Sequence, residues 1–279
     1  TISAYAGAHH TVVGFDKSQV VVERLNKGIS HIEGVESSAI AGLLAKGTYK
    51  ATTNATDIAG SDIVVIAVPT PLDAERNPDL SFVHAAADLI NQQVKTPALI
   101  INESTSYPGT LRNEIAARIT GVDHLYASSP ERVDPGNAQW GTKNTPRLIG
   151  GLTPAAFTKA VQFYGSFCDS IIEVSSPEVA EAAKIFENTF RQVNIALVNE
   201  LAQLCHRMEI DVWDVIEAAA TKPFGFQAFY PGIGAGGHCI PVDPLYLTWW
   251  ARQHGGKAEF IEAADSINHK MPMYVAQRA

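Results

Sequence analysis

Strand-like and helix-like segments alternate along the first part of the chain. A continuous apolar run, Asp62–Val68, is typical of a β-strand that is buried on both faces. Weaker runs of the same kind predict strands at His10–Phe15, Ala98–Asn102 and Leu125–Ser129. Helical periodicity fills the intervals, over Ser18–Asn26, Ser37–Ala45, Ser81–Val94 and Thr110–Ile119. This alternation predicts an α/β fold with a doubly wound parallel sheet.

The pattern becomes purely helical after about residue 175. Ser176-Pro177 followed by Glu178 is a helix-start signal, and the helix continues without Gly or Pro to about Met208. Later helices are predicted over Val212–Thr221, over Asp243–His254 with Asp243-Pro244 as N-cap and first turn, and from near Lys257. We therefore predict two domains, residues 1–175 around the sheet and residues 176–279 built from helices.

Composition is typical of a globular protein, and the net charge limits the classes of molecule that the chain is expected to bind. Its 279 residues, of which 46% are hydrophobic and 18% charged, are enough for two cores. The net charge of −8 argues against nucleic acid and anionic membranes as partners, and no apolar window approaches the length of a membrane span. Three widely spaced cysteines do not form a disulfide framework, which indicates a reducing compartment such as the cytoplasm.

Both ends of the sequence look interrupted. The chain starts without Met, in a short helix-like segment at Thr1–Gly7 that leads directly into the strand at His10–Phe15. It stops within a helix-like segment, Ser266–Ala279, that has no cap signal. We therefore expect part of a longer protein.

Cys239 is the strongest candidate for a reactive side chain. It follows the glycine-rich run Pro231–Gly237 and precedes a predicted helix start. Glycines let a ligand approach closely and a helix N-terminus favours a thiolate, so this pattern predicts a nucleophile. The other cysteines, Cys168 and Cys205, lie among apolar neighbours and are typical of core positions. A zinc site at His238 and Cys239 is disfavoured because no second ligand pair has suitable spacing, so we expect no metal.

Four polar residues follow predicted strands, where ligands bind in parallel sheets. Asp16 either accepts hydrogen bonds from the adenosine ribose of a dinucleotide or caps the following helix. Thr70, within Pro69-Thr-Pro71, either lines a cofactor cleft or ends a strand, and Thr105 has the same two interpretations. Glu131 can act as a base or hold a water, although a loop carboxylate is more often solvated.

One predicted helix carries a polar stripe. Lys184, Asn188 and Arg191 occupy positions i, i+4 and i+7, which places an ammonium, an amide and a guanidinium on one side. Such a stripe is usually solvated. Apolar residues on the other faces of this helix nevertheless indicate burial, and a buried lysine requires a reason.

Together these segments resemble the UDP-glucose/GDP-mannose dehydrogenase family over essentially the whole chain. The most specific is the block from Tyr230 to Leu247, whose core Gly-Gly-His-Cys-Ile-Pro-Val-Asp-Pro is most similar to the UDP-N-acetylhexosamine branch. Supporting similarity is found at Val13–Asp16, Ala67–Leu72, Asn102–Thr105, Ser129–Arg132 and Lys184–Asn194.

The resemblance implies a Rossmann-like NAD-binding domain, a helical central domain, and oxidation of a sugar C-6 alcohol to a uronic acid. The implied substrate is a UDP-N-acetylhexosamine, with UDP-N-acetylmannosamine favoured over UDP-N-acetylglucosamine. Cys239 would hold the aldehyde as a thiohemiacetal and then a thioester, while Lys184 and Asn188 would stabilise the oxyanions. The resemblance also implies that Glu131 and Thr105 activate a water, and that Asp243 lies beside Lys184 and this water. It assigns NAD binding to Asp16, Thr70 and Thr105. Substrate binding is assigned to Arg191, Tyr230, Gly232 and Gly236.

The chain also departs from this family. The loop reads Pro231-Gly-Ile-Gly-Ala235 where the family usually has Pro-Gly-Pro-Gly-Val. The first strand with its Gly-x-Gly-x-x-Gly turn and the C-terminal nucleotide-binding domain are both missing, so we expect the chain alone to be poorly active. Apolar positions in the last two helices suggest a homodimer. The alternatives are a UDP-glucose or GDP-mannose 6-dehydrogenase, a β-hydroxyacid dehydrogenase that needs no thiol, and a non-catalytic dimerisation module.

Overall fold

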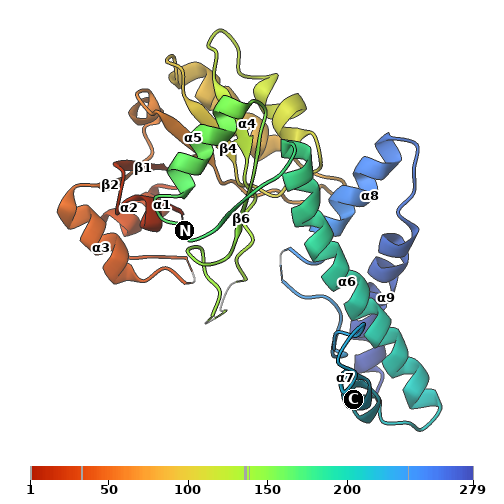
Figure 1. Cartoon of the computed structure of the whole chain (residues 1–279). Helices are drawn as coiled ribbons and strands as arrows, with labels where there is room; N and C mark the ends of the chain where they lie inside the picture. The colour runs from red at the N-terminus through yellow and green to blue at the C-terminus, as the bar shows by residue number, and fades with distance from the viewer. Residues whose placement is uncertain (1, 33, 135–136, 138, 238, 279) are drawn as a thin grey trace. The chain divides into compact units, whose positions relative to one another are not determined.

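The computed structural model describes residues 2–32, 34–134, 137, 139–237 and 239–278 (Figure 1). They fold as two compact units. The first comprises Thr1–Thr70 and Leu80–Glu181, and the second comprises Pro71–Asp79 and Ala182–Ala279. The last passage between the units lies within the long helix α6 (Pro177–Arg207), whose first residues belong to the first unit.

Helices and strands alternate along the first unit, as predicted. In chain order it contains α1 (Ile2–Ala6), β1 (Val12–Phe15), α2 (Gln19–Asn26), α3 (Ser37–Lys46), β2 (Tyr49–Thr52), η1 (Ala55–Ile58), β3 (Ile63–Ile66), α4 (Ser81–Gln93), β4 (Leu99–Asn102), the π-helical segment η2 (Leu111–Ala116), β5 (Leu125–Ser128), β6 (Arg147–Gly151), α5 (Pro154–Tyr164) and β7 (Ile171–Glu173). Local signals set several ends: Ser18 caps α2, Thr153 caps α5, and Gly47 ends α3 with φ +70°.

The strands form two separate sheets. β1 and β2 pair in parallel, while the other five strands follow the order β3-β4-β5-β6-β7. Neighbours in the larger sheet are parallel except for β5 and β6, which run antiparallel. The prediction of a parallel sheet is wrong for this one pair. The described part of the β5–β6 connection contains no helix, and a crossover between parallel strands is usually helical.

The buried centre of the larger sheet is β4. Its residues Leu99, Ile100 and Ile101 are each 0% exposed. In β3 only Ile66 is buried, and the residues before it are half-buried. The prediction that the Asp62–Val68 run is buried on both faces is therefore wrong. β3 is an edge strand, and among the described residues its outer side has no paired strand.

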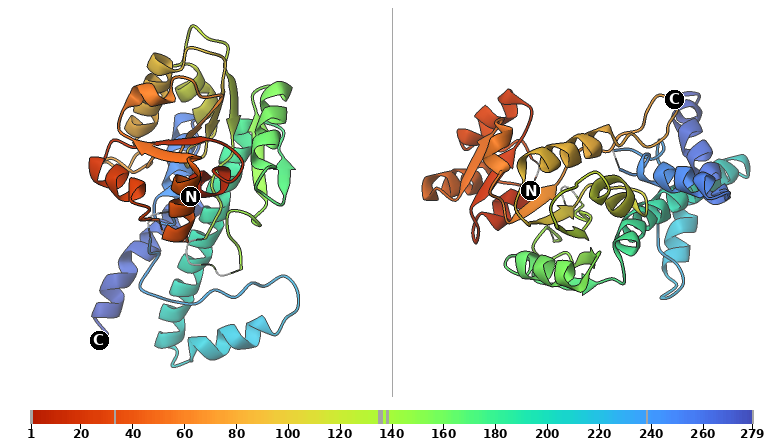
Figure 2. Two further views of the ribbon diagram at one scale, coloured as in Figure 1. Left: turned by 90° about the vertical axis from the view of Figure 1, so that its left-hand side faces the viewer. Right: turned by 90° about the horizontal axis from the view of Figure 1, so that it is seen from above.

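Helices cover both faces of the larger sheet, which is the doubly wound arrangement expected from the sequence. α5 packs on one face, where Leu99, Ile101 and Ile149 share a core with Phe163. Ile100 points to the opposite face because successive strand residues alternate, and α4 lies over that face (Figure 2). The carboxyl ends of the parallel strands thus emerge from a rigid, well-packed layer.

The second unit is built from helices. α6 is followed by α7 (Val212–Ala220), α8 (Asp243–Gln253) and α9 (Glu259–Ala276). The segment Pro71–Asp79 joins this unit through Arg76, whose guanidinium donates two hydrogen bonds of 2.9 Å to Asp265 of α9. Tyr246 of α8 also donates to the Pro71 carbonyl at 3.2 Å. Among the described residues, no helix combines the length and apolarity needed to cross a membrane.

Glu181, near the start of α6, fixes the loop that follows β4. Its carboxylate accepts the N–H of Gly109 at 2.7 Å and the N–H of Leu111 at 2.9 Å. Glu181 is 1% exposed and both donors are buried, so water is not an alternative partner. This loop contains Thr105, so Glu181 helps to hold a predicted site residue in place.

Replacing Glu181 with Ala should destabilise the protein by about 2–4 kcal/mol, because two buried N–H groups lose their acceptor. Glu181→Gln keeps one acceptor oxygen and should cost roughly half as much. The matched control on the same helix is Glu178→Gln, which loses a surface ion pair with Arg112 worth about 0–1 kcal/mol. Urea unfolding measures all three, and equal stability of Glu181→Ala and the control would refute the anchoring role.

Candidate active site

Cys239 lies in an exposed turn just before α8. Its carbonyl oxygen accepts the N–H of Val242 at 3.1 Å and of Asp243 at 2.8 Å, so the turn runs directly into the helix. Gly237, two residues before Cys239, has φ +82°, a conformation that favours glycine. The expectation of an open thiol is confirmed, and Cys168 and Cys205 are buried as expected.

The position before a helix does not ease ionisation of this thiol. Desolvation by its surroundings raises the pKa of Cys239 above its ordinary value, and the carboxylate of Asp243 raises it further. The Lys184 ammonium acts in the opposite direction without overcoming them. The raised pKa goes against the prediction of an easily formed thiolate, chiefly because the thiol is desolvated and secondly because Asp243 places a carboxylate at the helix N-terminus.

Lys184, Asn188 and Asp243 come together in the second unit. Asn188 Nδ2 donates a hydrogen bond of 2.5 Å to Asp243 Oδ2. Lys184, one turn before Asn188 on α6, is 9% exposed and Asp243 is 4% exposed. The predicted N-cap role of Asp243 is wrong: Val242 holds the cap position without a side-chain bond, and the Asp243 carboxylate pairs with α6 instead.

This environment changes the proton affinity of Asp243. Burial raises the pKa of Asp243 to about 6, while the Asn188 hydrogen bond and the Lys184 charge oppose the rise. The carboxyl therefore titrates near neutral pH instead of near its ordinary value of 3.8. The buried lysine and the oriented amide are suited to stabilising negative charge on a ligand. The carboxyl, whose pKa lies near neutral pH, is suited to transferring a proton.

The predicted substrate residues occupy the surface of the same unit. Arg191 is exposed on α6, and Tyr230 is 56% exposed before the glycine-rich run. The Gly232 N–H is already used, because it donates to Asn199 Oδ1 at 2.9 Å. Gly236 is exposed and has no atom within 4 Å of the position that a Cβ would take. Gly236 therefore leaves room for a ligand, whereas Gly232 anchors the loop.

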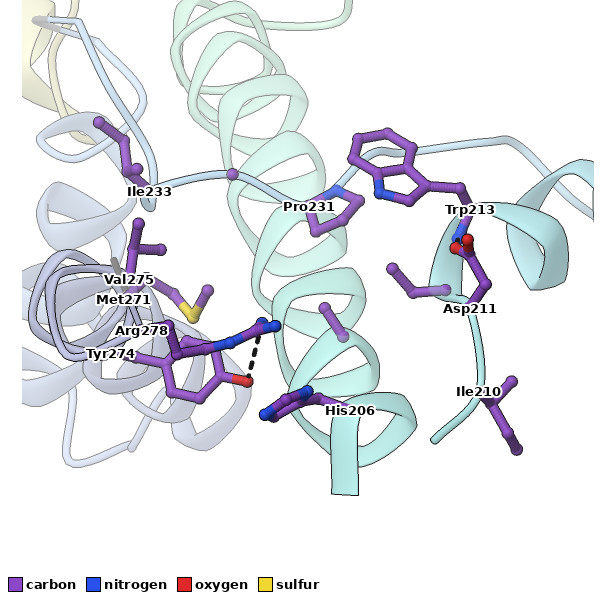
Figure 3. Close-up of a pocket in the computed structure, with 13 residues that line it drawn as sticks. His206, Ile210, Asp211, Trp213, Pro231, Ile233, Met271, Tyr274, Val275 and Arg278 are labelled. Carbon is purple, nitrogen blue, oxygen red and sulfur yellow. Dashed lines mark hydrogen bonds between the residues drawn. The ribbon is translucent and has the colours of Figure 1, made fainter. Parts of the chain in front are cut away.

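A separate cavity of about 430 Å³ opens elsewhere in the second unit (Figure 3). Its lining comes from the end of α6, the start of α7, the end of α9 and Pro231–Ile233. Trp213 at its edge stacks on Tyr230 with ring centroids 5.9 Å apart. The lining includes neither Cys239 nor Lys184, so this cavity is distinct from the cluster around the thiol.

In the first unit, Thr70 and Thr105 lie on loops that follow β3 and β4. Both side chains are half-buried. The Ser104 hydroxyl links these loops, because it accepts the Val68 N–H at 2.8 Å and donates to the Val68 carbonyl at 2.9 Å. One serine thus fixes the spacing of two loops that carry Thr70 and Thr105, the threonines predicted to contact NAD.

A buried ion pair that the sequence did not reveal lies under the same edge of the sheet. Arg147 Nη2 is 2.5 Å from Glu103 Oε1, and the two side chains are 4% and 6% exposed. The Tyr164 hydroxyl donates to the same oxygen at 2.7 Å, and the Arg147 guanidinium lies 4.6 Å from the centre of the Tyr164 ring. Burial raises the pKa of Glu103, although Arg147 works against that rise. In the sequence, the feature that could have indicated this pair is an arginine at the start of the otherwise apolar strand β6.

Glu131 is oriented by this pair. Its Oε1 accepts the N–H groups of Arg132 at 2.8 Å and Val133 at 3.1 Å. Its Oε2 lies 3.5 Å from Arg147 Nη1, and its N–H donates to the Glu103 carbonyl at 3.3 Å. A carboxylate held on both oxygens has a defined direction, which a base or a water-binding group requires.

The residues at the carboxyl ends of the strands fit an NAD molecule. Asp16 Oδ1 accepts the Ser18 N–H at 2.7 Å, and within the described chain Oδ2 has no hydrogen-bond partner, which leaves it for a ribose hydroxyl. Ser18, not Asp16, caps α2. Asn102 Oδ1 and the Ser128 hydroxyl, at the ends of β4 and β5, are buried polar atoms that find no partner among the described residues.

Over residues 2–278 without the undescribed positions, no group of three or more His, Cys, Asp or Glu is arranged to hold a metal ion. His238, considered above as a zinc ligand, lies outside the described residues.

Comparison with known proteins matches both units to one family. Residues 1–168 match the NAD binding domain of the UDP-glucose/GDP-mannose dehydrogenase family, and residues 178–270 match its central domain. The chain is 37% identical to a UDP-N-acetyl-D-mannosamine dehydrogenase of Pyrococcus horikoshii, over 99% of this chain and 66% of that protein. It is 36% identical to a UDP-N-acetyl-D-glucosamine 6-dehydrogenase of Pseudomonas aeruginosa, over 98% of this chain and 65% of that protein.

Solved structures show the same similarity. The structure of the Pyrococcus horikoshii enzyme superimposes with a TM-score of 0.90 at 35% identity, covering 98% of this chain and 66% of that chain. A UDP-glucose dehydrogenase from Pyrobaculum islandicum gives the same TM-score at 29% identity, with the same coverage of both chains. The chain thus spans about two thirds of the length of these relatives, and its backbone fold does not separate the two substrate classes.

The Asp243 pKa predicts a specific pH dependence of stability. Because the folded-state pKa of about 6 exceeds the ordinary value of 3.8, stability from the protonated carboxyl is complete at low pH and is lost as pH rises through 6. The loss should reach about 3 kcal/mol in the parent and should be absent in Asp243→Asn. Urea unfolding from pH 3.5 to 7.5, with exposed Asp214→Asn as control, measures it. A pH-independent difference between parent and Asp243→Asn would contradict the assignment.

Proposed function

The chain belongs to the UDP-glucose/GDP-mannose dehydrogenase family, and from this premise we propose that the complete protein oxidises the C-6 alcohol of a UDP-N-acetylhexosamine to the uronic acid. The observation that carries the proposal is the cluster in the unit that matches the family's central domain. There an exposed thiol, Cys239, shares one electrostatic environment with buried Lys184 and Asp243. A thiol next to a cation and an oriented amide suits capture of a carbonyl group.

The reaction needs two oxidations at one carbon. Two NAD molecules, bound one after the other, would each accept one hydride from C-6, and the C-6 hydroxyl loses its proton in the first oxidation. After the first, the Cys239 sulfur adds to the aldehyde carbon and its proton ends on the aldehyde oxygen, which forms a thiohemiacetal. Loss of the second hydride and of the hydroxyl proton leaves a thioester. Water then releases the acid and restores the thiol. Covalent attachment keeps the aldehyde from leaving between the oxidations.

Lys184 and Asn188 are assigned to the developing oxyanions. The ammonium of Lys184 is buried, where a charge interacts more strongly than in water. Asn188 uses one amide hydrogen on Asp243, which fixes the plane of the amide and leaves its second hydrogen for the substrate oxygen. Because the pKa of Cys239 is raised, we assign the loss of the thiol proton to the addition step. Asp243, beside Lys184, is assigned a share in these proton transfers.

Glu131 and Thr105 are assigned to the water that hydrolyses the thioester. Support for Glu131 comes from its orientation, since backbone N–H groups hold one oxygen and Arg147 the other. Thr105 is supported by its place on a loop that is anchored by Ser104 and Glu181.

The remaining residues are assigned to binding of NAD or of the nucleotide sugar. We assign NAD contacts to Asp16, Thr70 and Thr105 and contacts with the nucleotide sugar to Arg191, Tyr230, Gly232 and Gly236. For Gly232 the contact must come from its carbonyl or its Cα, because its N–H donates to Asn199. UDP-N-acetylmannosamine is the favoured substrate, and UDP-N-acetylglucosamine is the second candidate because a relative of each kind is similarly close. Family membership disfavours a β-hydroxyacid dehydrogenase.

A homodimer remains part of the proposal. The sequence suggested it from the last two helices, and in the second unit α6 and α9 both carry exposed large apolar side chains. Phe186, Phe190 and Leu197 are 65%, 46% and 61% exposed, and Phe260 of α9 is 82% exposed. Exposed apolar positions of this size on adjacent turns are typical of surfaces that pair.

Changing Cys239 to Ser should reduce formation of the uronic acid by the complete protein by about a thousandfold or more, because the alcohol cannot form the thioester. NADH release and product analysis with UDP-N-acetylmannosamine, UDP-N-acetylglucosamine, UDP-glucose and GDP-mannose measure activity and rank the substrates. Cys205→Ala, which alters a buried thiol, is the control and should keep the parental rate. Acid formation by Cys239→Ser at the parental rate would exclude the covalent route, and turnover of none of the four sugars would exclude the proposed activity.

A further inference from the structure

A buried side chain of α6 holds the glycine-rich loop. Asn199 is 0% exposed, and its Oδ1 accepts the N–H of Gly232 at 2.9 Å. Gly232 lies seven residues before Cys239 in the same loop. Figure 3 shows this segment crossing from Pro231, beside α6, to Ile233, beside α9. The contact therefore fixes the loop at the point where it passes between the two helices.

Asn199 is itself held by α9. Its Nδ2 donates to Asn268 Oδ1 at 3.1 Å, and Asn268 Nδ2 donates to the main-chain carbonyl of Gln192 at 3.1 Å. Asn268 is 7% exposed. A chain of hydrogen bonds therefore runs from the loop to α6, across to α9 and back to α6.

The two ends of this chain determine its direction. The Gly232 N–H can only donate, so Asn199 must present its oxygen to the loop and its NH₂ to Asn268. The Gln192 carbonyl can only accept, so Asn268 must present its NH₂ to α6 and its oxygen to Asn199. Both constraints agree, and only one orientation of each amide satisfies all three bonds. Such a fully satisfied buried network specifies one arrangement of the elements that it joins.

The loop also touches α9 directly. Gly234 has φ +111°, and a Cβ at this position would lie 2.6 Å from the main-chain oxygen of Asn268. Both the conformation and the close approach require glycine. The same α9 residue thus braces Asn199 through its side chain and bounds the loop through its backbone.

We propose that Asn199 and Asn268 are positioning residues that set the place of Cys239 by fixing the glycine-rich loop between α6 and α9. The functional importance of that place rests on the proposed function, but the positioning itself does not. An apolar side chain at 199 would leave the Gly232 N–H without its acceptor, and one at 268 would remove the group that orients the Asn199 amide. The two amides therefore hold the loop as well as joining the two helices.

The test uses Asn199→Leu and Asn268→Leu, which remove the amides and keep a branched side chain with the same number of heavy atoms. Asn194→Leu is the matched control on α6, because among the described residues its side chain bonds to its own helix, at the Phe190 carbonyl. Two quantities are measured on the folded chain without substrate: hydrogen exchange of the Gly232 amide by NMR, and the alkylation rate of Cys239 by iodoacetamide with peptide mass spectrometry. Urea unfolding reports global stability in parallel.

Asn199→Leu should speed Gly232 exchange about tenfold or more, the factor that corresponds to about 1.4 kcal/mol. It should change Cys239 alkylation about threefold or more, while the control changes neither. Asn268→Leu should act in the same direction but less, and the double variant should resemble Asn199→Leu because Asn268 acts through Asn199. Unchanged exchange and alkylation in folded Asn199→Leu would overturn the proposal, as would equal changes in the control.

A second variant serves if Asn199→Leu fails to fold. Gly234→Ala alters the exposed loop and leaves both amides intact, and it should displace the loop and change Cys239 alkylation to a similar extent. Parental alkylation in Gly234→Ala would overturn the proposal. Full acid formation by Cys239→Ser would remove the proposed chemistry but leave these measurements unaffected, so the two failures can be told apart.

Discussion

The hydrogen bond between Asn188 and Asp243 is the contact on which the site in the second unit depends. It joins the long helix α6 to the first residue of α8, and it does so where Asp243 is almost fully buried. A carboxylate in that position is costly unless it is paired, so the start of α8 cannot shift along α6 without losing the pair. Cys239 is tied to the same start, because its carbonyl accepts the N–H of Asp243. This buried contact therefore holds the end of the loop next to Cys239 against the helix that carries Asn188 and Lys184.

In the first unit, a buried ion pair orients a predicted site residue in a similar way. Arg147 and Glu103 are both buried under the carboxyl edge of the larger sheet, and Tyr164 completes the contacts of the Glu103 carboxylate. Because Arg147 also faces Glu131, the orientation of a loop carboxylate depends on an ion pair beneath it. In both units, a buried charged group gives direction to a side chain that is proposed to act on the ligand.

The periodicity of the sequence predicted much of the fold and part of the candidate site. The i, i+4 spacing of Lys184 and Asn188 placed them on one helix face, and the glycine-rich run predicted the exposure of Cys239. The alternation of strands and helices predicted the doubly wound unit. It did not reveal that β3 is an edge strand, because an apolar run carries no information about its neighbours. The short strands β2, β6 and β7 were not identified individually for a similar reason, since a few residues give little periodicity.

Long-range partners account for what the sequence could not provide. Glu103 and Arg147 are 44 residues apart, and Asn199 and Asn268 are 69 apart, so no local pattern connects them. The raised pKa of Cys239 was not predicted, for the same physical reason. The helix N-terminus was considered, but the desolvation of the folded loop and the charge of Asp243 outweigh it.

Direct detection of the covalent intermediate on Cys239 tests the account most sharply. In the complete protein, Glu131→Gln should slow hydrolysis of the thioester, so acid quenching during turnover with NAD and UDP-N-acetylmannosamine should trap the acylated enzyme. Peptide mass spectrometry should then find the sugar on the peptide that contains Cys239 and on no peptide that contains Cys168 or Cys205. Formation of uronic acid with no such adduct at any time would contradict a mechanism in which Cys239 holds the sugar between two oxidations.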